Sequence, residues 1–285
     1  MKIKIKMKRH ESFSIREGWL TKGLLAIRED PKVFSSEFPT DVLGIGTNMV
    51  KSLKYWLMAT NLVNMNKSNL EITEFGNLIL KYDPYMESDF TWWLIHINLL
   101  LNIDDFYIGN LIFNKCLSKN FSKEEIFKIC SNSLDMRNIE YNEKILMDEI
   151  NMIIKTYVID KSDETPENNF SCPLASLELL NKIGKDKYER IKPNYKTLNY
   201  LAVYYLLLTM LDGKEYISID ELITSPNSLA KILNLDKNLV NIYLDDMRRN
   251  RLITINRTAG LNMIYIQKKL NLNEIFEEYF GGEEL

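Results

Sequence analysis

One stretch near the N-terminus constrains the fold more than any other part of the sequence. Residues 43–63 read LGIGTNMVKSLKYWLMATNLV, in which two glycines lead directly into a run with helical periodicity. After these glycines Val50, Leu53 and Trp56 recur at helical spacing, so one side of the helix is apolar. Such a turn is typical either of a nucleotide site, in which glycines cradle a phosphate, or of a helix-turn-helix that contacts DNA.

The nucleotide-site interpretation fails because its other elements are missing. A dinucleotide turn has the pattern G-x-G-x-x-G and lies between a buried strand and a helix. Met49 takes the place of the third glycine, and the preceding SEFPTDVL does not have the pattern of a buried strand. The sequence also has no phosphate loop of the G-x-x-x-x-G-K-[ST] kind. We therefore predict no nucleotide cofactor, and no other cofactor is indicated.

The helix-turn-helix interpretation accounts better for the same residues. A short helix, a turn with glycines, a second helix and a small hairpin follow one another, as in a winged helix. Thr47 is expected to cap the second helix, and the N-terminal end of that helix would enter the major groove. A winged helix that serves only packing or protein contacts is the alternative. The side chains predicted to contact DNA are Thr47, Asn48, Lys51, Ser52, Lys54 and Tyr55.

The first nine residues, MKIKIKMKR, are basic and alternate between lysine and apolar residues. This period of two predicts a strand with one cationic face and one apolar face. Lysines in such a strand protect an exposed sheet edge from aggregation, and they are also suited to lie along DNA phosphates. In the second interpretation the phosphate contacts are Lys2, Lys4, Lys6 and Arg9.

A second winged helix is predicted near the C-terminus. Asp236 is expected to cap a helix over KNLVNIYLDDMRRNRL, and ITINRTAGLNMIYI has the strand, turn and strand pattern of a wing. Asp245 and Asp246 lie on the same helix and would repel phosphate, so a solvated helix end, stabilised by the helix dipole, is the alternative to DNA contact. The candidate phosphate contacts in this region are Arg248, Arg249 and Arg257.

The overall charge limits where DNA could bind. The chain of 285 residues has a net charge of -3, so any DNA contact must come from a local basic face. The longest apolar stretches are shorter than a membrane span and no secretory signal is recognisable, so we expect a cytoplasmic protein without membrane contact. Cys116, Cys130 and Cys172 form no C-x-x-C pair, which predicts buried reduced thiols.

Two clusters of polar residues are the candidates for chemistry. A metal-dependent nuclease needs paired carboxylates, which Asp83, Glu87 and Asp89 would supply, but these residues also suit the N-terminal end of a helix. His96 lies in the most apolar helix, where a core histidine is more typical than a metal ligand. His10 with its neighbours would form a buried hydrogen-bond network or contact a phosphate. We predict no catalytic residue and no metal site, and the residues left as a motif of unknown role are His10, Glu11, Arg16, Glu87 and His96.

Several blocks of the sequence, taken in order, resemble a known bacterial family of unknown function. They are RHESFSIREGWLTKGL, LGIGTNMVKSLKYWLMATNLV, EITEFGNLIL, DPYMESDFTWWLIHINL and SCPLASLELL, between Met7 and Leu180. The genes of that family lie among DNA phosphorothioate-modification and related phage-defence clusters, often beside sulfur-transfer enzymes of the PAPS-reductase type. The matching positions are His10, Glu11, Phe13, Arg16, Trp19, Gly23, Gly44, Gly46, Asn48, Met49, Lys51, Trp56, Asp83, Pro84, Glu87 and His96.

Two positions depart from the pattern of that family. Ser88 separates Glu87 from Asp89, where the family has an adjacent acidic pair. Cys172 precedes Pro173, where a serine is expected. The resemblance therefore implies a modification or defence context, but it supplies no reaction.

These observations predict a mainly α-helical protein with winged-helix units at both ends, a helical middle and short β-hairpins. The predicted domains are an N-terminal winged-helix-like DNA-binding domain (1–82), a helical middle domain (83–195) and a C-terminal winged-helix-like domain (196–285). The leading hypothesis is a non-enzymatic component of a DNA phosphorothioate-modification or anti-phage defence system. It would bind double-stranded DNA and present it to, or recruit, a PAPS-reductase-type sulfurtransferase. The alternatives are a protein–protein adaptor without DNA contact and, least favoured, a metal-dependent nuclease.

Overall fold

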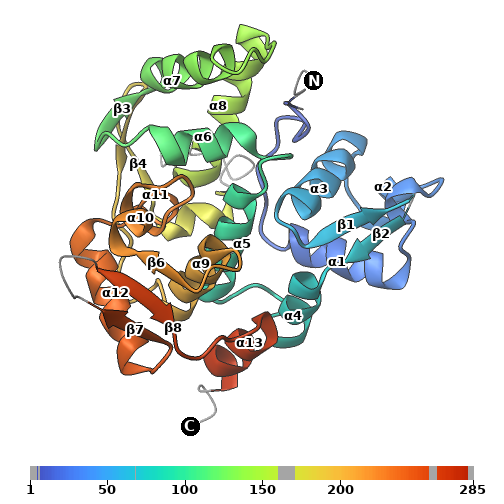
Figure 1. Ribbon diagram of the computed structural model, residues 1–285. Coiled ribbons are helices and arrows are strands. Elements are labelled where there is room, and N and C mark those ends of the chain that lie inside the picture. Colours follow the sequence, from blue (N-terminus) through green and yellow to red (C-terminus); the bar gives the residue numbers. More distant parts are fainter. Residues whose placement is uncertain (1–4, 6, 68, 160–170, 257–261, 282–285) are drawn as a thin grey trace. The chain divides into compact units, whose positions relative to one another are not determined.

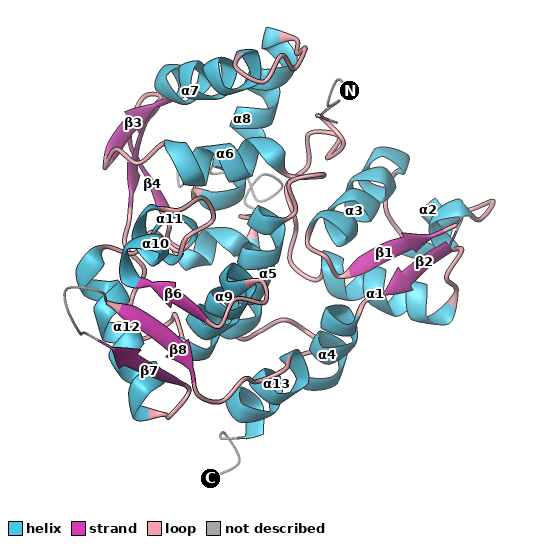
Figure 2. Cartoon of the chain, in the orientation of Figure 1, coloured by secondary structure: helices cyan, strands magenta, loops and turns pink. Residues whose placement is uncertain are grey.

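Helices make up most of the described chain, and its strands form three small antiparallel sheets (Figure 2). The structure, a computed structural model, confirms the predicted mainly helical fold with short hairpins. Among the described residues no helix has the length and apolar character needed to cross a membrane. The residues that the structure describes are 5, 7–67, 69–159, 171–256 and 262–281.

The chain divides into two compact units, Met1–Ile191 and Lys192–Leu285. The boundary between them lies close to the domain boundary that the sequence predicts at residue 195. The predicted boundary at residue 82 falls inside the first unit, so the N-terminal and middle segments belong to one compact body. The division into three domains stays a prediction.

After a first helix, the first unit continues with a short helix, a turn with glycines, a second helix and a hairpin, in the predicted order (Figure 1). Trp19, Leu20 and Leu24 lie on the buried side of α1, which packs against α3. Gly44 ends α2 with a φ of 61°, in the left-handed region that glycine adopts without steric cost. The elements are α1 (Trp19–Glu29), the 3-10 helix η1 (Val33–Ser35), α2 (Pro39–Leu43), α3 (Thr47–Ala59), β1 (Val63–Asn66), β2 (Asn69–Ile72) and α4 (Glu74–Tyr82).

A helix that is buried on all sides, α5 (Asp89–Leu101), forms the core of the first unit. Every residue in it from Phe90 to Leu100 is buried. The same segment holds a three-stranded sheet with the strand order β3-β5-β4, in the part of the chain that the sequence predicted as a helical middle domain. The other elements of this segment are α6 (Tyr107–Lys115), β3 (Asn120–Ser122), α7 (Lys123–Asp135), α8 (Glu143–Tyr157), the 3-10 helix η2 (Pro173–Leu177), β4 (Leu180–Gly184) and β5 (Lys187–Arg190).

The second unit has the element order of a winged helix (Figure 1). Its first strand pairs with its last, which gives the sheet order β6-β8-β7, and a long helix precedes the hairpin. Asp236 caps that helix as predicted, because its side chain accepts a hydrogen bond from the Leu239 N–H at 2.8 Å. The elements are α9 (Tyr200–Leu211), β6 (Tyr216–Ser218), α10 (Ile219–Thr224), α11 (Leu229–Ile232), α12 (Lys237–Arg249), β7 (Ile253–Asn256), β8 (Met263–Ile266) and α13 (Leu272–Phe280).

The same order of elements occurs in the first unit, from α6 to β5. In both places a helix is followed by a short strand, further helices and a hairpin whose last strand pairs with the first strand. In both places the serine that ends the first strand forms a capping box with the next helix, Ser122 with Glu125 and Ser218 with Glu221. The middle segment therefore holds a winged-helix order of its own, which the sequence analysis did not find.

Candidate nucleic-acid interface

The N-terminal end of α3 is the exposed part of the predicted recognition helix. Thr47, Asn48 and Lys51 are exposed, and Lys54 is half-buried. The first turn carries no acidic residue, so its free backbone N–H groups and the helix dipole favour an anion at this end. This end of α3 has the exposure and the electrostatics that a phosphate contact needs.

Gly46, and not Thr47, is the N-cap residue of α3. Thr47 is the first residue of the helix, and the N-cap position makes no side-chain hydrogen bond, so the prediction that Thr47 caps the helix is wrong. Glycine is tolerated at this position because it costs only a few tenths of a kcal/mol relative to serine or threonine. The Thr47 side chain is left exposed at the end of the helix.

Ser52 and Tyr55 are buried, so the structure removes them from the predicted DNA contacts. The Ser52 hydroxyl donates to the Phe13 carbonyl at 3.3 Å, and the Tyr55 hydroxyl donates to the Asp105 carbonyl at 2.9 Å. Burial, followed by the nearby Glu149 and Asp105 carboxyls, raises the pKa of Tyr55 well above its ordinary value. Both predictions fail because segments outside the helix-turn-helix cover this part of α3.

The hairpin after α3 adds further exposed polar groups. Asn64, Met65 and Asn66 are exposed on β1, and Lys67 follows them with a φ of 56°. Residues 1–82 contain 13 Lys and Arg against 8 Asp and Glu, although the whole chain has a net charge of -3. The positive charge that contact with DNA requires is therefore concentrated in this part of the sequence.

Arg9, another predicted DNA contact, is already paired within the first unit. Its Nη1 donates to the carboxylate of Asp105, and its guanidinium carbon lies 5.6 Å from the centroid of the Tyr55 ring. The neighbouring Lys8 Nζ lies 2.9 Å from Asp148 Oδ2. The predicted contacts that lie outside the described residues are Lys2, Lys4, Lys6 and Arg257.

His10 is buried and links the N-terminal segment to α8. The Ser12 N–H donates to His10 Nδ1 at 3.1 Å, so the ring proton is on Nε2, which donates to Glu149 Oε2 at 3.0 Å. The Lys8 N–H donates to the same oxygen at 2.8 Å. Lys8, Glu11 and Ser12 have φ values of 62°, 48° and 65°, which is unfavourable backbone geometry for residues other than glycine. The bonds around His10 hold this strained segment against α8.

Arg16, which belongs to the same motif, makes a different kind of contact. Its guanidinium carbon lies 5.3 Å from the ring centroid of Trp19 and 5.8 Å from that of Phe13. The Phe13 carbonyl accepts a hydrogen bond from Trp56 Nε1 at 2.8 Å, so this aromatic group joins α1 to α3. Two residues of the motif thus make different contacts: His10 forms a buried pair with Glu149, and Arg16 packs on aromatic rings.

His96 lies in the core of the first unit and is fully buried. Its Nδ1 lies 2.8 Å from the Tyr157 hydroxyl, and its ring meets those of Trp93 and Phe113 edge to face. Burial raises the pKa of Tyr157 well above its ordinary value. His96 therefore belongs to an aromatic core and not to a group of carboxylates.

The carboxylates of the nuclease alternative lie at the start of α5. Asp83 is 8% exposed, and its two oxygens accept hydrogen bonds from the Glu87 N–H at 2.9 Å and the Ser88 N–H at 3.1 Å. Glu87 and Asp89 are exposed. Asp83 therefore closes the turn before the helix. Among the described residues no group of three His, Cys, Asp or Glu side chains could hold a metal ion.

The two described arginines of the C-terminal interface each pair with an aspartate on their own helix. Arg248 pairs with Asp245 at 3.1 Å, and Arg249 pairs with Asp246 at 2.9 Å. Asp246 also accepts a hydrogen bond from the Tyr195 hydroxyl at 2.5 Å. These pairs reduce the positive charge that α12 can offer to DNA, so the N-terminal end of α3 is the stronger candidate interface.

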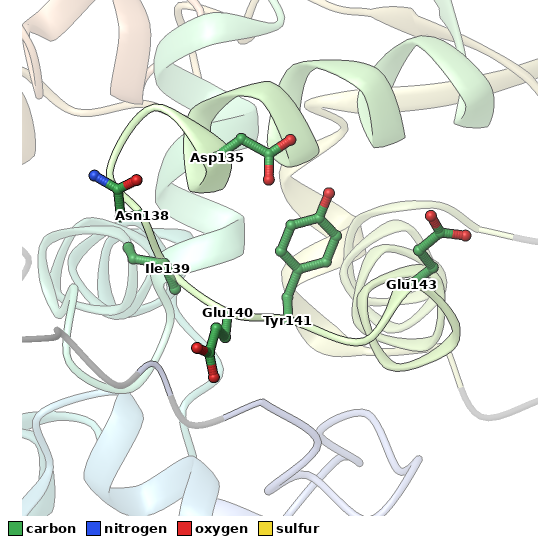
Figure 3. Close-up of a pocket in the computed structure, with 6 residues that line it drawn as sticks. All are labelled: Asp135, Asn138, Ile139, Glu140, Tyr141 and Glu143. Carbon is green, nitrogen blue, oxygen red and sulfur yellow. The ribbon is translucent and has the colours of Figure 1, made fainter.

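A pocket of about 590 Å³ lies at the connection between α7 and α8 (Figure 3). Its lining carries three carboxyl groups and no lysine or arginine, so it repels phosphate. In Figure 3 the Tyr141 ring stands between Asp135 and Glu143, and burial, followed by the Asp135 carboxyl, raises the pKa of this phenol. The lining residues are Asp135, Asn138, Ile139, Glu140, Tyr141 and Glu143.

The three cysteines are buried free thiols, as predicted. Burial raises the pKa of Cys116 to about 11, and it raises the pKa of both Cys130 and Cys172 to about 12. Burial thus favours the protonated thiol over the thiolate at all three positions.

Comparison with known proteins identifies a matching family and two similar solved structures. The family described as "Protein of unknown function (DUF4007)" matches residues 7–280. The structure described as "Magnesium ion-bound SspB crystal structure" is 20% identical, with a TM-score of 0.85 over 97% of this chain and 88% of that chain. The structure described as "SspB crystal structure" is 19% identical, with the same TM-score and coverage. No curated protein matches the chain. At these identities the likeness concerns the fold.

Proposed function

We propose that this chain, which belongs to the DUF4007 family of unknown function, binds double-stranded DNA as a non-enzymatic component of a phosphorothioate-type modification or defence system. One observation carries the proposal. The N-terminal end of α3 exposes Thr47, Asn48 and Lys51, without an acidic residue in its first turn, in a helix-turn-helix followed by a hairpin. In this arrangement the N-terminal residues of the second helix contact base edges and phosphates in the major groove.

The chemical types of these residues suit two kinds of contact with DNA. Lys51 and Lys54 offer charge to phosphate oxygens, and so do the free N–H groups at the start of α3. Asn48 offers both an amide donor and a carbonyl acceptor, the pair of groups that recognises an adenine edge. Phosphate contacts therefore supply the affinity in this proposal, and Asn48 supplies base readout.

The proposed context is the modification or defence system implied by the sequence blocks between Met7 and Leu180. In that context the chain presents DNA to a sulfurtransferase of the PAPS-reductase type, or recruits that enzyme. The acidic pocket between α7 and α8 repels DNA, so it stays available to a cationic surface of such an enzyme. Cytoplasmic location belongs to the same proposal.

Binding of a fluorescently labelled duplex, measured by anisotropy across a salt series, tests the DNA-binding function. Each phosphate contact contributes about -0.9 to the slope of log K against log salt, so a slope steeper than about -2 is expected. A phosphorothioated duplex of the same sequence shows whether the modification is read. If no duplex binds at about 50 mM salt, the DNA-binding proposal is wrong, and the adaptor function takes its place.

A magnesium-dependent nuclease is the second candidate, because one of the similar structures is described as magnesium ion-bound. In this chain the oxygens of Asp83 accept backbone N–H bonds, while Glu87 and Asp89 are exposed. Incubation of supercoiled plasmid with the protein and MgCl₂ is expected to leave the plasmid intact. Cleavage that disappears in both Glu87→Ala and Asp89→Ala would instead establish the nuclease.

A further inference from the structure

Two carboxylates hold the cations of the N-terminal segment beside α3. Arg9 is hydrogen bonded to the carboxylate of Asp105, which precedes α6. Lys8 is paired at 2.9 Å with Asp148 on α8. Both cations belong to the basic stretch that opens the sequence, and both are paired within the first unit.

Arg9 extends the proposed DNA face of α3. Tyr55 follows Lys51 by four residues, so the two side chains share one face of the helix and lie one turn apart. The Arg9 guanidinium packs on the Tyr55 ring, 5.6 Å from its centroid. The Arg9 guanidinium therefore adds a positive charge to the face of α3 that carries Asn48 and Lys51. This charge lies one turn beyond Lys51, where the side chain of the helix itself is the buried Tyr55.

The segment has a fixed part and an exchangeable part. His10 is 2% exposed and donates to Glu149, which fixes the chain at this point. The side chains of Lys8 and Asp148 are 45% and 35% exposed, and those of Arg9 and Asp105 are 31% and 15% exposed. Ion pairs that water reaches exchange partners at small cost, and the Lys8–Asp148 pair, the more exposed of the two, does so most readily. A phosphate offers the same charge and the same acceptor oxygens as these carboxylates.

We propose that Asp105 and Asp148 compete with DNA phosphates for Arg9 and Lys8, and so limit the affinity of the α3 face for DNA. When DNA binds, its phosphates replace the two carboxylates as partners of the two cations, while His10 keeps the segment in place. The inference rests on the proposed DNA-binding function and adds the means by which the affinity of that site is set.

Three variants test this competition: Asp105→Asn, Asp148→Asn and the double variant that combines them. Asparagine keeps the size of the side chain and removes the charge that holds the cation. Because no carboxylate has to be displaced from either cation, the double variant is expected to bind roughly tenfold tighter than the unaltered chain, while the salt slope stays the same, since the same two cations contact phosphates in both complexes. The measurement is the same anisotropy titration across the salt series.

Asp186→Asn is the matched control for this experiment. Asp186 pairs with Lys123 at 3.1 Å on the surface, so its replacement changes the net charge by one unit, as each single variant does, without releasing Lys8 or Arg9. The control is expected to bind as the unaltered chain does. Adding Lys8→Gln and Arg9→Gln to the double variant is expected to remove the gain in affinity and to make the salt slope shallower by about 1.8, which assigns the gain to these two cations.

The outcomes separate this inference from the function on which it rests. If the unaltered chain binds DNA and the double variant binds no tighter than Asp186→Asn, the competition is wrong and the DNA-binding function stands. If only the double variant binds DNA, the competition and the DNA-binding function both stand, and the two carboxylates block the α3 face completely. If neither binds at low salt, both are wrong. Circular dichroism of each variant verifies that the fold is retained.

Discussion

A variant with glutamate in place of both Lys51 and Lys54 is expected to bind a DNA duplex roughly 100-fold more weakly than the unaltered chain at moderate salt. The substitutions remove two cations from the exposed face of α3 and place two anions opposite the phosphates. The salt slope is expected to become shallower by about 1.8, since two phosphate contacts are lost. Anisotropy of a labelled duplex across a salt series measures both quantities.

The control reverses two lysines elsewhere in the first unit. Lys155 is exposed on α8 and Lys185 is exposed between β4 and β5, so Lys155→Glu with Lys185→Glu changes the net charge by the same amount away from the α3 face. Only a small loss of affinity is expected from this control. Equal losses in the two double variants would mean that the net charge of the chain, and not the α3 face, governs binding. Unchanged binding by the α3 variant would place the interface elsewhere.

His10→Ala is expected to lower the free energy of unfolding of the first unit by roughly 3 kcal/mol, since it leaves the buried Glu149 carboxyl without its side-chain donor. The substitution removes the Nε2–H donor from the buried Glu149 carboxyl and the acceptor from the Ser12 N–H. It also releases the segment whose backbone has positive φ at Lys8, Glu11 and Ser12. Urea unfolding followed by tryptophan fluorescence measures the loss.

Tryptophan fluorescence suits this measurement because all four tryptophans, at positions 19, 56, 92 and 93, belong to the first unit. His10→Gln is the control, because a glutamine amide can donate to Glu149 from the position of Nε2. We expect it to recover about half of the lost stability. A His10→Ala variant with an unchanged urea midpoint would show that the buried pair contributes nothing to stability.

Local sequence patterns were sufficient to predict the structure wherever neighbouring residues determine it. The periodicity of Val50, Leu53 and Trp56 predicted α3 and its apolar side, and all three residues are buried. Asp236 was predicted as the cap of α12 because its type and its place before an apolar run carry that signal, and it caps the helix. The exposed start of α3 follows from the same local rules, since its polar residues precede the packed part of the helix.

The contacts that span the chain could not be read from such patterns. His10 and Glu149 are 139 residues apart, and Tyr55 meets Asp105 across 50 residues. Helical periodicity placed Tyr55 and Ser52 on the outer side of α3, and it contained no information about the segments that cover this side. The signal for a buried role was present only in Tyr55 itself, whose ring is largely apolar.

The sheet of the middle segment was missed for a different reason. Its strands contain three to five residues each, too few to establish an alternation, and most of their side chains are polar. The pairing of β3 with β5 joins Asn120–Ser122 to residues 187–189, so no pattern of neighbouring residues predicts this pairing. Ser122 and Glu125 have the spacing of a capping box, but this pattern predicts the start of a helix and not the strand before it.

The repeated order of elements from α6 to β5 and from α9 to β8 is what tandem duplication of one ancestral module would leave in a gene. In the first set α8 holds the chain's own N-terminal segment through Asp148 and Glu149, and in the second set α12 holds the segment before α9 through Asp246, which accepts from Tyr195, and Tyr243, which donates to the Leu198 carbonyl. A gene fragment that begins at residue 83 would therefore encode a module whose buried Glu149 has lost both of its donors.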